Sequence, residues 1–563
     1  MPEPNSAEVA AAPGDLGPAV KQKRGGSFAM FVAAGILLSR IFGLVREKVF
    51  AHYLGNSDAA GVFKAALRIP NMLQNLFGEG VLSASFIPVY ARLLAEGDEE
   101  MAGRVAGVVA SLLALVTSAL VLLGVLFTPQ LLFFIAPGFK GDVRELTISV
   151  VRILFPAIGL LVVSAWCLGI LNSHRKFFLS YVAPVFMNIC MIGTLFIFGG
   201  RMTDRSLAVA LAWGTVVGAA AQFLVQVPFV LKHEKRLRFA VDTKLAPVQQ
   251  VLRNFVPVVV GKGVVQLSAY LDNLIATLLG TAATAAIGYA QTLAVLPVSL
   301  FGMSVSAAEL PAMSSATGSQ EEINEALRKR LERGLRQIAF FVIPSVVAFI
   351  LIGNVLVAAL FQGGRFGDDD TRYVWYILIG STVGLLAATL GRLYSSAFYA
   401  LHDTKTPLRY AMLRVSLTGV LGYLFALPLR PLLLSAMRSL HIPMPLIRGS
   451  SEPLGAIALT ATAGIAGWIE FALLRRSLSK RIGRARLAPS FLLRLWAAAL
   501  AAGVASAAFY WRALPHVTRY LPHIFPHVRD GALVCALFGA IYFAAAAALR
   551  VEEVRGVVAR FRR

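Results

Sequence analysis

Residues 27–50 read SFAMFVAAGILLSRIFGLVREKVF. A bilayer-spanning helix needs about 20 mostly apolar residues, so this stretch is long enough to cross a membrane. It nevertheless contains Arg40, Arg46 and Glu47. A charged side chain at membrane depth costs at least about 2.5 to 3.5 kcal/mol and usually faces a polar cavity or a partner. The stretch therefore indicates a membrane transporter whose hydrophilic interior is biased toward positive charge.

The rest of the chain has the composition of a polytopic membrane protein. Of its 563 residues, 57% are hydrophobic and 15% are charged, whereas soluble proteins carry about 25% charged residues. Because backbone polar groups in lipid must be satisfied within each segment, we expect an all-α protein. Apolar runs predict about 14 transmembrane helices, near 28–50, 70–95, 105–135, 147–171, 179–199, 206–231, 251–279, 282–313, 335–361, 373–401, 408–429, 453–474, 490–511 and 530–549.

The distribution of basic residues predicts the orientation. The net charge is +23, and one side of the predicted topology carries about twice as many Lys and Arg residues as the other, which places both termini in the cytoplasm. The densest basic runs, 232–238, 328–336 and 475–486, lie beside predicted spans. They are typical of orientation signals and anionic-lipid contacts, so membrane lipids are expected partners and nucleic acid is not.

The sequence repeats itself at an offset of about 225 residues, as transporters often do. Ala51-His-Tyr-Leu-Gly55 resembles Ala276-Thr-Leu-Leu-Gly280. Six spans fit within one offset, so the two halves share an orientation and are parallel repeats. The expected organisation is a disordered cytoplasmic tail (1–26), an N-terminal six-helix lobe (27–231), a C-terminal six-helix lobe (251–429 and 453–474), two additional helices (490–549) and a cytoplasmic tail (550–563).

The first span carries candidate ligands for an anion. Arg40, Gly43 and Glu47 share one helical face, and Arg46 is about 120° away from it. Arg40 lies roughly 18 Å from residue 28, near the middle of the bilayer. A guanidinium in a wet cavity matches phosphate geometry. The alternative is a structural Arg–Glu pair that locks the helices together.

Further charged residues follow in the second and seventh predicted spans. Lys64 and Arg68 share a face, and they either line the cavity or extend to lipid headgroups. Glu79 lies deeper and could pair with Arg40 or Arg46 when the cavity is empty.

Lys262 lies near mid-depth of the seventh span. Asp272 and Asn273 offer oxygen atoms that suit Na⁺, or a proton. The alternative for Asp272 is a structural couple with Lys262 or another span.

No motif predicts an enzyme or a cofactor. The chain lacks a phosphate-binding Gly-x-x-x-x-Gly-Lys-Ser/Thr loop, so ATP-driven transport on this chain is not expected. Three histidines, His516, His523 and His527, lie in one loop without carboxylates. Metal binding there is not favoured.

A set of motifs resembles the MurJ (MviN) family. They are Ser39-Arg40-Ile-Phe-Gly43-Leu-Val-Arg46-Glu47, Arg68-Ile-Pro70-Asn71, Phe77-Gly-Glu79-Gly80, Ala136-Pro137-Gly138-Phe139, Ala183-Pro184 with Asn188-Ile189, and Phe398-Tyr-Ala-Leu-His402-Asp-Thr-Lys-Thr-Pro407. The resemblance implies a member of the multidrug and oligosaccharidyl-lipid exporter superfamily. It implies that the chain flips lipid II, the undecaprenyl-pyrophosphate-linked peptidoglycan precursor, across the bacterial inner membrane. Cell-wall synthesis proteins are further implied partners, and the last two helices are implied to form a groove for the lipid tail.

By position, Arg40 and Arg46 match two arginines that are important in the family, and Glu79 matches its acidic residue. The chain departs from the family at Gln74, where an arginine is usual, and at Gln291-Thr292, where Asp-Arg is usual.

Lys64, Arg68 or Lys262 could restore the missing charge. We therefore expect a lipid II flippase that uses alternating access. The alternatives are an exporter of another undecaprenyl-linked saccharide or a drug, and a non-transporting cell-wall scaffold.

Overall fold

A computed structural model describes residues 18–315, 318–441, 452–518 and 525–556. Within these ranges the regular structure is helical, and the one β-type contact is an isolated bridge between Gly363 and Phe366. The expectation of an all-α fold is therefore confirmed.

The first lobe contains nine helical segments. They are α1 (Pro18–Leu54), α2 (Asp58–Phe77), α3 (Glu79–Ser85), α4 (Ile87–Ala95), α5 (Glu99–Leu126), α6 (Thr128–Ile135), α7 (Gly141–Ser173), α8 (Phe177–Phe198) and α9 (Asp204–His233). Helix α1 begins inside the segment 1–26 that the sequence assigns to a tail. Helix α2 is capped by Ser57, whose side chain accepts a hydrogen bond from the Ala60 N–H.

The second lobe and the two additional helices follow. The lobe contains α10 (Ala246–Leu278), α11 (Thr281–Pro297), the π-helical turn η1 (Val298–Met303), α12 (Ser304–Ser314), α13 (Gln320–Leu351), α14 (Gly353–Phe361), α15 (Asp368–Ala400), α16 (Lys405–Ala426), α17 (Arg430–Ser439) and α18 (Glu452–Ile482). The additional elements are α19 (Pro489–Ala508), the π-helical turn η2 (Phe509–Ala513), α20 (Leu514–Thr518) and α21 (Pro526–Ala548).

Ten described helical stretches are long and apolar enough to cross a membrane, or up to 11 if the bent pair of α16 and α17 is one span. The predicted count of 14 is therefore not confirmed. Helices α1, α2 and α10 are not among the ten. Helix α17 makes an angle of 64° with α16. The chain therefore bends sharply just after residue 429, where the predicted span 408–429 ends.

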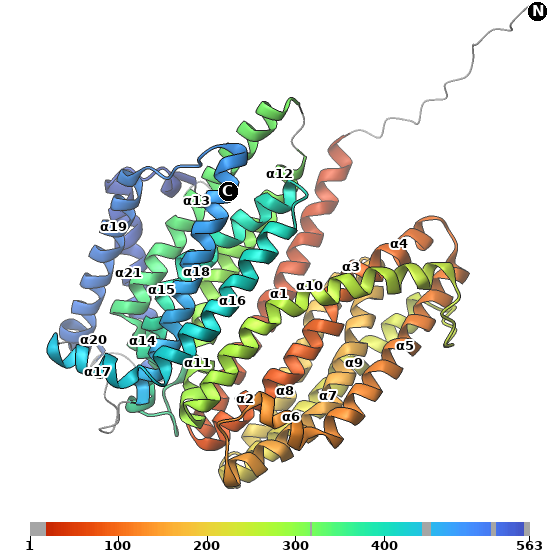
Figure 1. The fold of residues 1–563 in the computed structure, drawn as a ribbon, viewed down its shortest axis with the longest axis horizontal. Helices are drawn as coiled ribbons and strands as arrows, with labels where there is room; N and C mark the ends of the chain where they lie inside the picture. Colours follow the sequence, from red (N-terminus) through yellow and green to blue (C-terminus); the bar gives the residue numbers. More distant parts are fainter. Residues whose placement is uncertain (1–17, 316–317, 442–451, 519–524, 557–563) are drawn as a thin grey trace, which may run out of the picture.

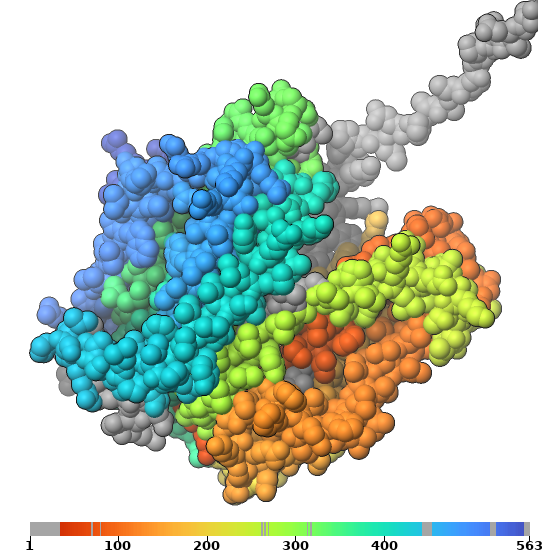
Figure 2. Space-filling view, in the orientation of Figure 1, coloured from red at the N-terminus to blue at the C-terminus, as the bar shows by residue number. Residues whose placement is uncertain are grey.

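The two lobes lie side by side and diverge toward one end (Figure 1). We call the end that holds the start of α1 and the end of α21 the near end, and the opposite end the far end. Helix α10 links the lobes, because it packs on α2 and α3 of the first lobe and on α16 of the second. Figure 2 shows α10, in yellow-green, lying across the first lobe and meeting the second lobe toward the far end.

Hydrogen bonds to backbone carbonyl groups join the lobes at the far end. The Arg365 N–H donates to the His52 carbonyl (2.9 Å), and the Lys48 ammonium donates to the Ala359 carbonyl (3.0 Å). The Tyr289 hydroxyl donates to the Gly55 carbonyl (2.7 Å). We call this set of contacts the far-end seam.

The additional helices pack on the outside of the second lobe. Helix α19 contacts α13, and α21 contacts α14 and α19. The buried Tyr542 hydroxyl donates to the Phe340 carbonyl (2.6 Å) and so fixes α21 against α13. These helices therefore extend the second lobe and do not line the space between the lobes.

Candidate functional site

A cavity with charged side chains in its wall lies between the two lobes. It has a volume of about 400 Å³ and is lined by α1, α2, α10 and α11, with Met191 of α8. Among the described lining residues, the charged ones are Arg40, Arg46, Glu47, Lys64, Arg68 and Asp272. They come from α1, α2 and α10, three long helices that are not among the ten apolar spans. Four cations against two carboxylates give the described wall a net positive charge.

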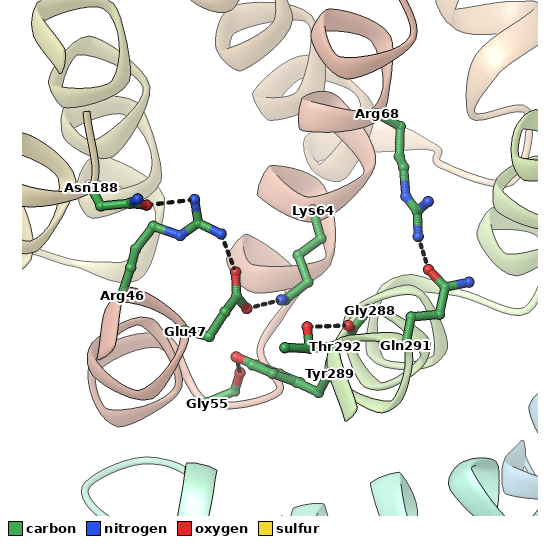
Figure 3. A network of polar contacts seen from close by, with 10 residues as sticks. All are labelled: Arg46, Glu47, Gly55, Lys64, Arg68, Asn188, Gly288, Tyr289, Gln291 and Thr292. Atoms are coloured by element: carbon green, nitrogen blue, oxygen red, sulfur yellow. Dashed lines mark hydrogen bonds and ion pairs between the residues drawn. The ribbon is translucent and has the colours of Figure 1, made fainter. Parts of the chain in front are cut away.

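Glu47 is the centre of the ion-pair network in this cavity (Figure 3). One carboxylate oxygen accepts a hydrogen bond from Arg46 (2.8 Å), and the other accepts one from Lys64 (2.6 Å). The side chains of Glu47 and Lys64 are only 14% and 12% exposed. Opposite charges at this depth stabilise one another because little water screens them. One carboxylate thus holds two cations at the cavity wall.

Lys64 is enclosed by residues of both lobes. Its ammonium lies over the rings of Tyr289 (4.1 Å to the centroid) and Phe50 (5.0 Å). Its stem fills the space beside Gly288 of α11, where an added Cβ would come within 2.6 Å of the Lys64 Cδ. Lys64 therefore lines the cavity, and the alternative of an extension to lipid headgroups does not hold.

The two arginines of α1 have different partners. Arg40 reaches across the cavity and donates to the Ser299 hydroxyl of η1 (2.9 Å). Arg46 donates to the buried Asn188 side chain of α8 (3.0 Å). Arg46 lines the same cavity as Arg40 and Glu47, although the helical wheel predicts it about 120° from their face. The cavity thus contacts a wider face of α1 than we predicted, because Arg46 bends toward Glu47.

Arg68 connects α2 to the second lobe. It donates to the side-chain oxygen of Gln291 on α11, and it interacts electrostatically with Asp272 of α10. Asp272 also interacts with Arg414 of α16, and its Oδ1 is buried without a hydrogen-bond partner. Two guanidinium groups therefore provide the countercharge for Asp272.

Sequence reasoning missed several residues of the site. The signal that identifies a site residue in the sequence is a charge inside an apolar run. This signal is absent at Tyr289, Asn188 and Ser299, which are neutral. Arg414 was missed although it lies within a predicted span. It pairs with Glu470 of α18, with 3.4 Å between the closest atoms, and the membrane-depth rule would have selected both.

The structure also locates the positions where the chain departs from the motif pattern. Gln291 and Thr292 line the cavity, whereas Gln74 is not among the described lining residues. The Thr292 hydroxyl donates to the Gly288 carbonyl (3.1 Å) and contributes no charge. The side chains of Glu79 and Lys262 lie outside the described part of the structure, so their predicted roles stay predictions.

The chemistry that this cavity supports is anion binding. Guanidinium and ammonium groups are the side chains that bind phosphate most strongly, and here four of them, all on α1 and α2 of the first lobe, line the cavity. Among the described residues there is no group of three or more His, Cys, Asp or Glu that could hold a metal ion. His523 of the predicted histidine loop lies outside the described residues.

Comparison with protein families identifies close sequence relatives. The family described as lipid II flippase MurJ matches residues 50–527. A Vibrio cholerae protein named probable lipid II flippase MurJ is 30% identical over 410 residues, covering 70% of this chain and 77% of the relative. A Rhizobium tropici protein of the same name is 32% identical over 406 residues, covering 70% of this chain and 74% of the relative.

Solved structures share the fold. A lipid II flippase MurJ in an inward closed conformation aligns with a TM-score of 0.69 at 22% identity, covering 92% of this chain and 99% of that chain. An inward-facing multidrug resistance MATE family transporter of the MOP superfamily aligns with a TM-score of 0.59 at 18% identity, covering 80% of this chain and 98% of that chain.

Proposed function

The chain belongs to the MurJ lipid II flippase family, and we propose that it moves lipid II from the cytoplasmic to the outer leaflet of the inner membrane. It is a transporter and not an enzyme. The substrate is a polyprenyl diphosphate that carries a glycan. The diphosphate cannot cross hydrocarbon unaided, because burying an unpaired anion in an apolar medium is prohibitively unfavourable.

The observation that carries this proposal is the positive cavity between the lobes. Arg40, Arg46, Lys64 and Arg68 line it, and Glu47 and Asp272 are its described anions. A diphosphate diester carries two negative charges, which would balance the excess of two positive charges. We propose that Arg40 and Arg46 bind the diphosphate, with Lys64 and Arg68 supplying the charge absent at Gln74 and Thr292.

Alternating access is the mechanism that fits this geometry. The far-end seam joins the lobes, while the lobes diverge toward the near end (Figure 1). We propose that the near end faces the cytoplasm and admits the substrate. The far-end seam then separates to release it. The polyprenyl tail stays in lipid and passes along α19 and α21, which lie outside the two lobes.

The test is function of charge-removing variants in cells depleted of their own flippase, with lipid II flipping measured in proteoliposomes. Arg40→Ala and Arg46→Ala should lose most activity at equal protein level. Arg438→Ala is the matched control, because it removes an exposed positive charge on α17, away from the cavity.

Equal activity of all three variants would refute the diphosphate site. A non-transporting scaffold would fail to restore growth even as wild type.

A further inference from the structure

Lys64 belongs at once to the cavity and to the packing between the lobes. Its ammonium faces Glu47 at 2.6 Å, while its stem lies against Gly288 of α11. Helix α2 belongs to the first lobe and α11 to the second. The side chain therefore joins a substrate-binding surface to a surface that must separate when the far end opens.

Tyr289, whose ring lies under the Lys64 ammonium, makes one of the hydrogen bonds of the far-end seam. Tyr289 is fully buried, and its hydroxyl donates to the Gly55 carbonyl at the turn between α1 and α2. Its ring contacts Phe361 and Phe366, with centroids 5.0 Å and 5.1 Å away. The Lys64 ammonium lies over the Tyr289 ring, 4.1 Å from its centroid. A cation held over an aromatic face is attracted to it, so the ammonium helps to keep α2 and α11 together.

Glu47 holds the ammonium in that position. It accepts hydrogen bonds from Arg46 and Lys64 with its two oxygens. An anion that enters the cavity and binds Arg46 competes with Glu47 for Arg46 and Lys64. Its negative charge also repels the Glu47 carboxylate. Figure 3 shows the three side chains side by side, with Tyr289 and Gly288 below Lys64.

We infer that Lys64 couples anion binding in the cavity to separation of the far-end seam. A diphosphate draws the ammonium away from Glu47 and from the Tyr289 ring, and the Lys64 stem leaves the space beside Gly288. The contact between α2 and α11 then weakens only when substrate is present. This role rests on the proposed function for its natural ligand, but the coupling can be measured with inorganic pyrophosphate alone.

The chain offers a matched control in Lys48. It also joins the lobes at the far end, through a hydrogen bond to the Ala359 carbonyl. Unlike Lys64, it is not among the residues that line the cavity. Removing either ammonium should loosen the seam, but removal of Lys64 alone should abolish the response to an anion.

The experiment measures thiol labelling at the seam in the full-length protein in nanodiscs. The native Cys167, Cys190 and Cys535 are replaced by alanine, and Ala282→Cys introduces a reporter in the first turn of α11, beside Thr281. In the wild-type background, pyrophosphate should raise the labelling rate at least about threefold. Lys48→Met should raise the basal rate and keep the pyrophosphate response, whereas Lys64→Met should raise the basal rate and lose the response.

Two further variants keep the inference testable if Lys64→Met does not fold. Lys64→Arg retains the charge and should retain the response. Gly288→Ala pushes against the Lys64 stem and should reach the half-maximal response at a lower pyrophosphate concentration. A Lys64→Met protein that responds like wild type, or a wild type that does not respond, overturns the coupling. The same holds for a Gly288→Ala protein that needs as much pyrophosphate as wild type.

Flipping of lipid II by the same wild-type preparation separates this inference from the proposed function. Active flipping without a pyrophosphate response refutes the coupling and leaves the function intact. A pyrophosphate response without lipid II flipping supports the coupling and refutes the substrate assignment.

Discussion

Arg40 presents a planar guanidinium to the cavity and spends one of its donors on Ser299 (2.9 Å). A lysine has no fork with which to hold Ser299 and a phosphate oxygen together. Hydrogen bonds between charged groups contribute about 1.5 to 3 kcal/mol each, so Arg40→Lys should reduce flipping roughly tenfold or more. Ser299→Ala should have a small effect, because it removes only the hydroxyl that Arg40 binds when the cavity holds no substrate. Equal losses in these two variants, measured as initial rates in proteoliposomes, would mean that Arg40 acts through Ser299 and not on the substrate.

Asp403 lies in the loop between α15 and α16, and its role is structural. Its carboxylate accepts hydrogen bonds from the Thr406 N–H (2.9 Å) and hydroxyl (2.7 Å) and pairs with Arg481 (2.7 Å). The hydrogen bonds from Thr406, together with the charge of Arg481, lower the pKa of Asp403 to about 2.

A lowered folded-state pKa stabilises the protein above the unfolded pKa of about 3.9, and this contribution is lost as the pH falls toward about 2. Loss of a side chain that accepts hydrogen bonds from the first turn of a helix costs about 0.5 to 2 kcal/mol. Asp403→Ala should therefore lower the melting temperature at pH 7, and the difference from wild type should shrink below pH 4. A difference that stays constant from pH 7 to pH 3 would contradict this account.

The charged residues of the site and an Arg–Glu pair on the first span could be predicted from the sequence, whereas the partners from other helices could not. A charge inside an apolar run is visible in one sequence, which is why Arg40, Arg46 and Glu47 were selected. The partner of each charge depends on which helices pack together. Lys64 and Glu47 are 17 positions apart, and the contact exists because α1 and α2 return along one another. Neutral partners such as Tyr289 give no such signal, so the enclosure of Lys64 required the structure.

Helices α2 and α11 approach closely because α2 has no side chain at Gly61. An added Cβ there would lie 2.3 Å from the Thr281 carbonyl oxygen. The obstacle is backbone, so it cannot rotate away. Overpacking of this kind costs about 1 to 3 kcal/mol, and Gly61→Ala should lower the melting temperature and raise labelling at the far-end seam.

Gly193 of α8 is the matched control, since an added Cβ there meets nothing within 4 Å. Gly193→Ala should be neutral or stabilising, because alanine is favoured over glycine inside a helix by about 0.5 to 1 kcal/mol. Similar destabilisation of both variants would place the effect of Gly61→Ala in the helix itself and not in the seam.

At the scale of elements, the sequence repeat predicts turns better than it predicts helix shape. Gly55 and Gly280, which the repeat pairs, both adopt positive φ values (57° and 106°), a conformation that glycine reaches without strain. Arg175 and His402, which follow the ends of α7 and α15, also have positive φ values (59° and 58°). The π-helical turn η1 could not be predicted, because the apolar run continues through it. Pro297 immediately precedes it, and a proline removes one backbone donor from the helical ladder.

The orientation of the whole molecule follows from its basic loops, and we predict that the near end is cytoplasmic. Gly367 precedes α15 at the far end, His516 lies in α20, and Ser479 lies near the end of α18. Cysteines introduced at Gly367 and His516 should react with an impermeant maleimide added to intact cells. A cysteine at Ser479 should react only after lysis. Labelling of Ser479 in intact cells would reverse the orientation.

The net charge of the cavity also determines how the membrane potential acts on the whole cycle. With two excess positive charges in its described wall, the empty carrier is cationic, while the carrier loaded with a diphosphate diester is nearly neutral. Each elementary charge that crosses 100 mV gains or loses about 2.3 kcal/mol, so an inside-negative potential favours return of the empty cavity to the cytoplasmic side.

Asp272 is the candidate ligand for a coupling cation. The positive charges of Arg68 and Arg414 nearby disfavour a further cation there, so we expect Na⁺ to have little influence. In proteoliposomes, an inside-negative potassium diffusion potential should accelerate multiple-turnover flipping, and replacing Na⁺ with choline should not slow it. Removing one excess charge by Lys64→Met should weaken the voltage dependence even where activity remains. A flipping rate that falls when Na⁺ is removed and does not change with the potential would contradict this account. It would instead support coupling to Na⁺, with Asp272 as the candidate ligand.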